Sequence, residues 1–177
     1  MFLNADLNLK IKNISHTSSS SAKQVEELLA CYHQIRRQTE ALCEPLRPED
    51  FMLQAMPEVS PTKWHLAHTT WFFEALLLKE FQPDYVWVNE AFVTLFNSYY
   101  QSVNTPYPRD RRGLLSRPDL GEVFAYRRTI DERMEAFMAA LPAHQLAAVV
   151  ERLTLGLQHE QQHQELILMD IKYNFFC

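Results

Sequence analysis

Residues 157–177 read LQHEQQHQELILMDIKYNFFC. Apolar residues recur in this stretch at steps of three and four, which is the spacing of one face of an α-helix. His159 and His163 stand four positions apart, so they project from the same side of that helix, one turn from each other. Two imidazoles at this spacing are a common way to hold a metal ion. The stretch therefore predicts a long helix that carries two candidate metal ligands.

The same helix face carries several polar groups besides these imidazoles. Steps of three and four from Leu155 lead to a polar set within a leucine-rich stripe: His159, Gln162, His163 and Asp170. Burying such groups without partners is costly, so something should satisfy them. A metal ion would do so, and helical bundles build metal sites from side chains on facing helices. A third ligand is therefore expected from another helix.

Residues 60–81, SPTKWHLAHTTWFFEALLLKEF, form the second histidine-bearing segment. Ser60 and Pro61 are typical of a helix start. The segment is apolar nearly all round, as expected for a helix that packs on several sides. His65 and His68 lie about one turn apart in its first half. Spacing alone does not choose between them as the third ligand.

Two further segments complete a set of four helices. Residues 21–46 and 119–141 place apolar side chains at three- and four-residue steps. The helix that contains the two candidate ligands is expected to cover residues 144–176, because Pro142 separates it from the preceding segment. No convincing alternation of polar and apolar residues indicates a strand. The sequence therefore predicts an all-α fold, a four-helix bundle.

The second and third helices are separated by residues 82–118, which are rich in proline, aromatic residues and arginine. At most one short helix is expected there, near residues 90–96. A connection this long is often functional in a compact domain. We expect a bundle over residues 21–177, with a long, partly irregular insertion between helices 2 and 3. Residues 1–20 read as a flexible lead-in.

Composition limits the class of protein. The chain has 177 residues, of which 47% are hydrophobic, and this is enough for one buried core. A net charge of -5 gives no electrostatic reason to expect a nucleic-acid partner. No apolar stretch reaches the ~18 residues of a membrane span. Cys31, Cys43 and Cys177 lack metal-type spacing and read as free thiols, which favours the cytoplasm.

The letters HEQQH also match H-E-x-x-H, the signature of zinc peptidases. In those enzymes the glutamate between the ligands is the general base and the third ligand lies downstream. One extended form of the signature needs Gly at position 166 and His at position 169, where Leu166 and Met169 stand. Little sequence remains before Cys177 for a more distant ligand. The spacing therefore disfavours a peptidase.

Two long motifs, SPTKWHLAHTTWFFE and HEQQHQELILMDIKYNF, resemble the N-terminal DinB-like helical domain of the sulfoxide synthases of ergothioneine biosynthesis. The resemblance runs from about Gln24 to the end of the chain and includes RPEDFMLQAMPEVSP and RRGLLSRP. The ovothiol and selenoneine synthases share this architecture. The resemblance implies a DinB-like four-helix bundle and a mononuclear non-haem iron(II) centre, Fe(2+). The implied ligands are His68, His159 and His163.

The resemblance also implies a reaction and further site residues. These enzymes use iron and O2 to join a thiol, cysteine or gamma-glutamylcysteine, to the imidazole carbon of hercynine, producing a sulfoxide. Gln162 resembles the residue that hydrogen-bonds the substrate imidazole. Arg109 and Arg112 resemble a pair that binds the carboxylates of the thiol substrate, although solvated loop arginines are an alternative reading. His65 is then a near neighbour of the ligands. Many family members carry aspartate at this position, so His65 is not among the implied ligands.

Sulfoxide synthases carry a second, C-terminal domain that resembles the formylglycine-generating enzyme and supplies the catalytic tyrosine. The present sequence stops at that junction, so the expectation is a metal-binding half, with the second domain absent or in a longer or separate chain. One alternative is a stand-alone DinB-like metal-dependent thiol transferase. Another is a non-catalytic, truncated association module, in which the aromatic segment at residues 85–100 mediates self-association.

Overall fold

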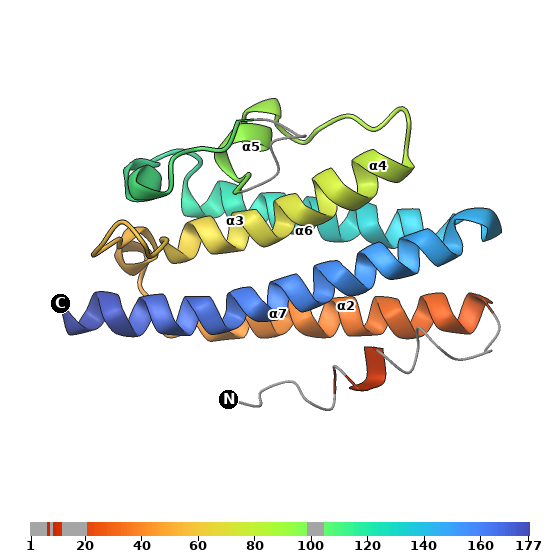
Figure 1. Ribbon diagram of the computed structural model, residues 1–177, viewed down its shortest axis with the longest axis horizontal. Helices are drawn as coiled ribbons and strands as arrows, with labels where there is room; N and C mark the ends of the chain where they lie inside the picture. The colour runs from red at the N-terminus through yellow and green to blue at the C-terminus, as the bar shows by residue number, and fades with distance from the viewer. Residues whose placement is uncertain (1–6, 8, 12–20, 99–104) are drawn as a thin grey trace.

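The computed structural model describes residues 7, 9–11, 21–98 and 105–177, and these form helices and connecting segments without a β-strand (Figure 1). The four long helices are α2 (Ser21–Cys43), α3 (Thr62–Phe73), α6 (Leu120–Ala139) and α7 (Leu146–Phe176). A π-helical turn (Glu74–Leu78) extends α3 into the short α4 (Lys79–Phe81). The predicted all-α bundle is confirmed. The lead-in predicted for residues 1–20 lies almost entirely outside the described residues.

The four long helices close into a bundle in which α2 and α3 each contact both α6 and α7. In Figure 1, α3 and α6 run in one direction and α2 and α7 run in the opposite one. Because α3 and α6 are parallel, the chain between them has to travel back along the bundle. The insertion makes this return with α5 (Glu90–Leu95) and a 3-10 turn (Arg109–Leu114). The 3-10 turn was not predicted.

Local chemistry accounts for the helix starts. α6 begins after Asp119, whose carboxylate accepts the N–H of Glu122 at 2.8 Å, while the Glu122 carboxylate accepts the N–H of Asp119 at 2.6 Å. This reciprocal arrangement is a capping box. α3 begins at Thr62, one residue later than predicted from a cap at Ser60 and a first helical residue at Pro61, because Pro61 has an extended ψ of 143°. The N–H of Ser60 instead donates to a side chain of α7, as described below.

Every residue of α3 is buried, as its sequence predicts. This includes Lys63, whose Nζ donates to the carbonyl oxygens of Leu115 and Pro118, both at 2.7 Å. Lys63 therefore connects the C-terminal end of the insertion to α3, the helix that carries His65 and His68.

A buried ion cluster joins α7 to the three other long helices. The carboxylate of Glu160 accepts Nη1 of Arg36 at 3.0 Å, Nη2 of Arg127 at 3.1 Å and the hydroxyl of Thr39 at 2.7 Å. Arg36 also donates to the hydroxyl of Thr70 on α3, at 3.0 Å. Breaking such a buried pair leaves an uncompensated charge and is strongly destabilising. The cluster therefore fixes the rotation of α7 about its own axis.

The three cysteines are thiols without disulfide partners, as predicted. Cys31 and Cys43 are buried and Cys177 is exposed. Burial raises the pKa of the Cys43 thiol to about 12, which leaves it unreactive. Of the helices described, none combines the length and the low polarity that a bilayer crossing requires.

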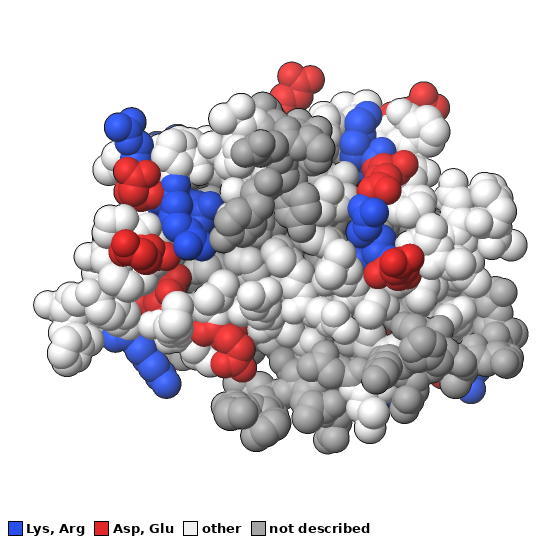
Figure 2. All heavy atoms as spheres, in the orientation of Figure 1, with Lys and Arg blue, Asp and Glu red and all other residues white. Residues whose placement is uncertain are grey.

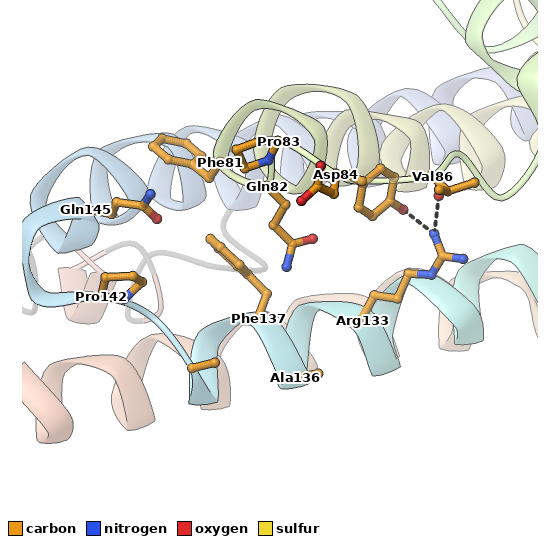
Figure 3. A pocket seen from close by; sticks show the side chains of 12 residues that line it. Phe81, Gln82, Pro83, Asp84, Val86, Arg133, Ala136, Phe137, Pro142 and Gln145 are labelled. Atoms are coloured by element: carbon orange, nitrogen blue, oxygen red, sulfur yellow. Dashed lines mark hydrogen bonds between the residues drawn. The ribbon is translucent and has the colours of Figure 1, made fainter.

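The surface in Figure 2 shows basic and acidic side chains lying next to one another on the viewed face. A groove of about 650 Å³ lies where α4 and the residues after it meet the end of α6 (Figure 3). Arg133 at its edge donates to the hydroxyl of Tyr85 at 2.7 Å and to the carbonyl of Val86 at 2.8 Å. None of the residues that line this groove is a histidine. It is therefore separate from the candidate metal ligands.

Within the aromatic segment that was expected to mediate self-association, burial is uneven. Tyr85, Phe92 and Phe96 are buried in the core, whereas Val86 is 75% exposed. Residues 99 and 100, at the end of that segment, lie outside the described part of the chain. Self-association stays a prediction.

Helices α7 and α3 approach each other closely at Gly156. A Cβ atom at this position would lie 2.6 Å from a ring carbon of Phe73 and 3.0 Å from one of Phe72. Both distances are shorter than an ordinary carbon–carbon contact. The absence of a side chain therefore lets α7 rest against the aromatic rings of α3, one turn before His159.

Replacing Gly156 with alanine tests this close approach. Alanine favours a helix over glycine by about 1 kcal/mol, but its methyl group has to displace the ring of Phe72 or Phe73. We therefore expect Gly156→Ala to lower the free energy of unfolding by about 1–3 kcal/mol, measured by chemical denaturation. Gly121→Ala is the matched control, because Gly121 is exposed and the nearest atom to its added Cβ lies 3.3 Å away. Undiminished stability of Gly156→Ala would contradict the close contact.

Candidate metal centre

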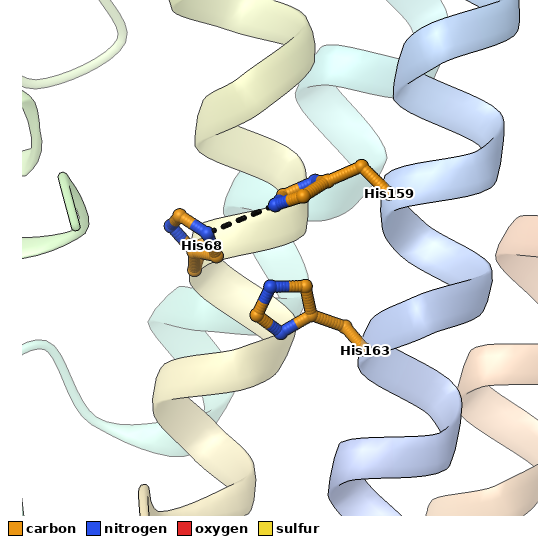
Figure 4. A group of neighbouring side chains, drawn as sticks. All are labelled: His68, His159 and His163. Atoms are coloured by element: carbon orange, nitrogen blue, oxygen red, sulfur yellow. Dashed lines mark hydrogen bonds between the residues drawn. The ribbon is translucent and has the colours of Figure 1, made fainter. Parts of the chain in front are cut away.

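The structure brings together the three histidines that the sequence analysis predicts as metal ligands. His68 comes from α3, and His159 and His163 come from adjacent turns of α7 (Figure 4). One ring nitrogen from each lies within 4.8 Å of the others. Nε2 of His68 is 3.2 Å from Nε2 of His159. This histidine triad can place three nitrogen donors around one ion.

The hydrogen bonding of His68 leaves one ring nitrogen available to a metal. Its Nδ1 lies 2.6 Å from the carbonyl oxygen of Phe96, which directly follows α5. A carbonyl oxygen can only accept, so Nδ1 carries the hydrogen and Nε2 keeps its lone pair. Metal-ligating histidines commonly donate their other N–H in this way. The insertion therefore orients a candidate ligand on α3.

Aromatic rings hold two of the imidazoles in place. Trp64 stacks on His68 with ring centroids 4.5 Å apart and an interplanar angle of 14°. Phe72 stacks on His159 with centroids 4.6 Å apart and an angle of 30°. Apolar walls of this kind cover the ring faces and restrict ring rotation.

All three imidazoles of the triad are held in the neutral form. Burial, followed by the positive charge that neighbouring groups would carry, lowers the pKa of His68 and that of His163 well below the ordinary value of a histidine. Burial also lowers the pKa of His159 to about 4. Neutral imidazole is the form that donates a lone pair to a metal. Near neutral pH, protons therefore do not compete for these nitrogens.

The chemistry of this donor set fits a divalent transition-metal ion. Imidazole nitrogen suits zinc, copper, iron and nickel, whereas magnesium and calcium prefer oxygen ligands. Three protein donors also leave coordination positions open, as in catalytic rather than purely structural sites. The triad is thus suited to holding an ion that also binds a small molecule.

His65 lies beside the triad, as expected of a near neighbour, but its nitrogens face other groups. Its Nδ1 is 2.8 Å from Nδ1 of His163, and its Nε2 is 3.0 Å from Oδ2 of Asp170. The same Oδ2 accepts the N–H of Ser60 at 2.9 Å. Both ring nitrogens of His65 are therefore engaged, one by His163 and one by Asp170, whereas Nε2 of His68 faces Nε2 of His159.

Gln162 and Arg109, two of the predicted substrate-binding residues, are both exposed. Gln162 lies on α7 between the two histidines of the triad, and Arg109 begins the 3-10 turn of the insertion. Their substrate roles stay predictions.

Arg112, the third predicted substrate-binding residue, is only 2% exposed. Its guanidinium lies 3.3 Å from the ring centroid of Trp64. It also donates to the hydroxyls of Ser60 at 2.9 Å and Ser98 at 3.1 Å. Arg112 thus supports the ring that stacks on His68, a structural role that the sequence analysis did not identify. Its role toward a substrate stays a prediction.

The glutamate of the H-E-x-x-H letters faces away from the triad. Burial alone would raise the pKa of Glu160, but the charges of Arg36 and Arg127 outweigh it and lower the pKa to about 2. A carboxylate this acidic, with both oxygens engaged in the ion cluster, cannot serve as a general base. The structure therefore agrees with the rejection of a peptidase.

Three neutral imidazoles that converge from facing helices define this chain as a helical bundle with a candidate transition-metal site. Its sequence matches the DinB superfamily over residues 32–167, a span that contains the whole triad, and the chain belongs to this superfamily. DinB proteins are in general associated with metals, in agreement with the triad. A search of curated proteins finds no significant match to the chain.

The ion cluster around Glu160 predicts how stability depends on pH. Its pKa is about 2 in the folded protein against an ordinary value of 4.5, so its contribution is complete above about pH 4.5 and is lost as the pH falls toward 2. We expect Glu160→Gln to lower the free energy of unfolding of the metal-free protein by about 3–5 kcal/mol at neutral pH. The difference in free energy of unfolding between Glu160→Gln and the native protein should become smaller as the pH falls from about 4.5 toward 2.

Chemical denaturation across this pH range measures the effect. Glu165→Gln is the matched control. Glu165 is an exposed carboxylate on the same helix, so its replacement should change the free energy of unfolding little. A difference between Glu160→Gln and the native protein that stays constant down to about pH 2 would contradict the role of the ion pairs.

Proposed function

We propose that this chain is the iron-binding helical part of a non-haem iron(II), O2-dependent sulfoxide synthase that joins a cysteine-type thiol to hercynine. The observation that carries the proposal is the convergence of His68, His159 and His163 in neutral form, within 4.8 Å, in a DinB superfamily bundle. The motifs that resemble the sulfoxide synthases are the same stretches that supply these three residues.

Iron(II), when bound, would supply the redox chemistry that O2 requires. The chain itself supplies the binding and the orientation. The carbonyl of Phe96 fixes the tautomer of His68, and the rings of Trp64 and Phe72 cover the imidazoles of His68 and His159. These contacts hold the donors in fixed orientations.

The exposed residues around the triad suit the proposed substrates. The side-chain amide of Gln162 can both donate and accept, which matches the imidazole of hercynine. The guanidinium of Arg109 suits a carboxylate, such as that of cysteine or gamma-glutamylcysteine. After the effects of burial and of the neighbouring imidazole His159, the charge of Arg112 further lowers the pKa of His68. A positive field at the site would attract an anionic thiol substrate.

We also propose that a second domain, resembling the formylglycine-generating enzyme, completes the site in a longer or separate chain. Gln162 is exposed on the histidine-bearing helix, so another domain or a partner can reach this side of the triad.

A stand-alone, metal-dependent thiol transferase is the second candidate. The family match covers the bundle and the triad without specifying one enzyme, and this supports both candidates equally. A transferase would use the open coordination positions to bind and activate a thiolate, with zinc as a suitable ion. Consumption of O2 separates the two candidates, since only the sulfoxide synthase requires it.

Iron retention tests the ligand set. The native chain and the variants His68→Ala, His159→Ala and His163→Ala are loaded with iron(II) without O2, desalted and measured by elemental analysis. We expect about one iron per native chain and a loss of at least about tenfold in affinity for each variant, because each removes one of three donors. His144→Ala is the control, because His144 is exposed and remote in sequence from the triad. Unchanged retention in all three variants would refute the site.

Oxygen uptake tests the reaction. The iron-loaded chain is mixed with hercynine and with cysteine or gamma-glutamylcysteine, alone and together with the C-terminal domain of a sulfoxide synthase. We expect O2 uptake that depends on both substrates and a sulfoxide product, detected by mass spectrometry. Zinc-dependent thiol transfer without O2 consumption would instead favour the transferase.

A further inference from the structure

A chain of hydrogen bonds leads from the histidine triad to a buried carboxylate. Nδ1 of His163 lies 2.8 Å from Nδ1 of His65, and Nε2 of His65 lies 3.0 Å from Oδ2 of Asp170. The exposed fractions are 8% for His163, 3% for His65 and 4% for Asp170. The hydrogen bonds are therefore shielded from water, which makes each one stronger and its loss more costly.

The carboxylate end of this chain determines where the hydrogens lie. An ionised carboxylate only accepts, so Nε2 of His65 donates to Asp170. A neutral His65 then has a bare Nδ1, which can only accept from His163. The hydrogen of His163 consequently lies on its Nδ1, and its Nε2 keeps the lone pair.

We propose that Asp170 and His65 are positioning residues that fix the tautomer and the ring orientation of His163, so that its Nε2 is the atom presented to the metal. This inference rests on the proposed metal centre, but it depends neither on which metal binds nor on the substrates. In many metal sites a carboxylate contacts the ligand histidine directly. Here one additional imidazole, His65, stands between the carboxylate and the ligand.

The fold holds the far end of this chain in place. Asp170 lies two turns after His163 on α7, and its Oδ2 also accepts the N–H of Ser60 at 2.9 Å, just before α3 begins. Its Oδ1 is buried and has no hydrogen-bond partner among the residues that the structure describes. Oδ2 alone therefore connects the start of α3, the His65 ring and α7.

A double-mutant cycle of His65 and Asp170, with metal affinity as the measured quantity, tests whether these two residues act through His163. Cobalt(II) is the probe, and its dissociation constant is measured by titration calorimetry. We expect His65→Phe to weaken binding about 10–100-fold, and Asp170→Leu to weaken it as well. Asp170→Asn should retain most of the affinity, because its amide oxygen can still accept from His65. In the His65→Phe background, Asp170→Leu should add little, since the link is already broken.

Two outcomes of this cycle would overturn the proposal. One is a cobalt(II) affinity of His65→Phe equal to that of the native chain. The other is a double variant whose fold-loss in affinity equals the product of the fold-losses of His65→Phe and Asp170→Leu, because the two residues would then act independently. Thermal melting of each metal-free variant shows whether it folds. His68→Ala separates the two levels of inference: if it abolishes cobalt binding while His65→Phe does not, the metal centre stands and only the positioning role fails. Full binding by His68→Ala would refute the metal centre itself.

The tautomer of His163 gives a second readout that a merely structural role would not change. Long-range ¹H–¹⁵N spectra of the metal-free protein report which ring nitrogen carries the hydrogen. We expect the Nδ1–H form of His163 in the native chain and in Asp170→Asn, and a mixture of forms in His65→Phe. An Nε2–H form of His163 in the native chain would overturn the proposal, even if all variants fold.

Discussion

The pairing of Glu160 with Arg36 and Arg127 is the constraint on which the rest of the structure depends. It draws one side of α7 toward α2 and α6 and so fixes the rotation of that helix. His159 precedes Glu160 and His163 follows it by three positions, so this rotation turns both imidazoles toward α3. Gly156 then sets the distance, because a helix with a side chain there could not lie so close to the rings of α3. Rotation and distance together allow donors from two helices to meet.

The imidazoles of the triad are held rigidly and in the neutral form, and each property has an identifiable source. Aromatic rings from α3 cover His68 and His159. Hydrogen bonds from Nδ1 of His68 to Phe96 and from Nδ1 of His163 to His65 leave Nε2 of both rings without a hydrogen. The glutamate next in sequence to His159 contributes no ligand, because two guanidinium groups engage it. An ion held here would therefore keep its full charge and its open positions, which favours binding of anionic or polarisable small molecules.

Much of this arrangement could be predicted from the sequence, because it rests on periodicity. Steps of three and four place the four long helices to within a few residues and put His159, His163 and Asp170 on one face. Periodicity does not give long-range pairing, so it could not choose between His65 and His68 or reveal the ion partners of Glu160. Arg112 shows the limit most clearly: the family resemblance suggests a substrate contact, whereas the stacking of Arg112 on Trp64 depends on the path of the insertion.

The central claim is that three imidazoles from α3 and α7 bind one ion. Anomalous diffraction at the iron edge, from crystals of the iron-loaded chain grown without O2, tests it most directly. We expect a single anomalous peak at about 2.1 Å from ring nitrogens of His68, His159 and His163, a usual metal–imidazole bond length. A peak bonded to His65 in place of His68, or no peak among these rings, would contradict the account.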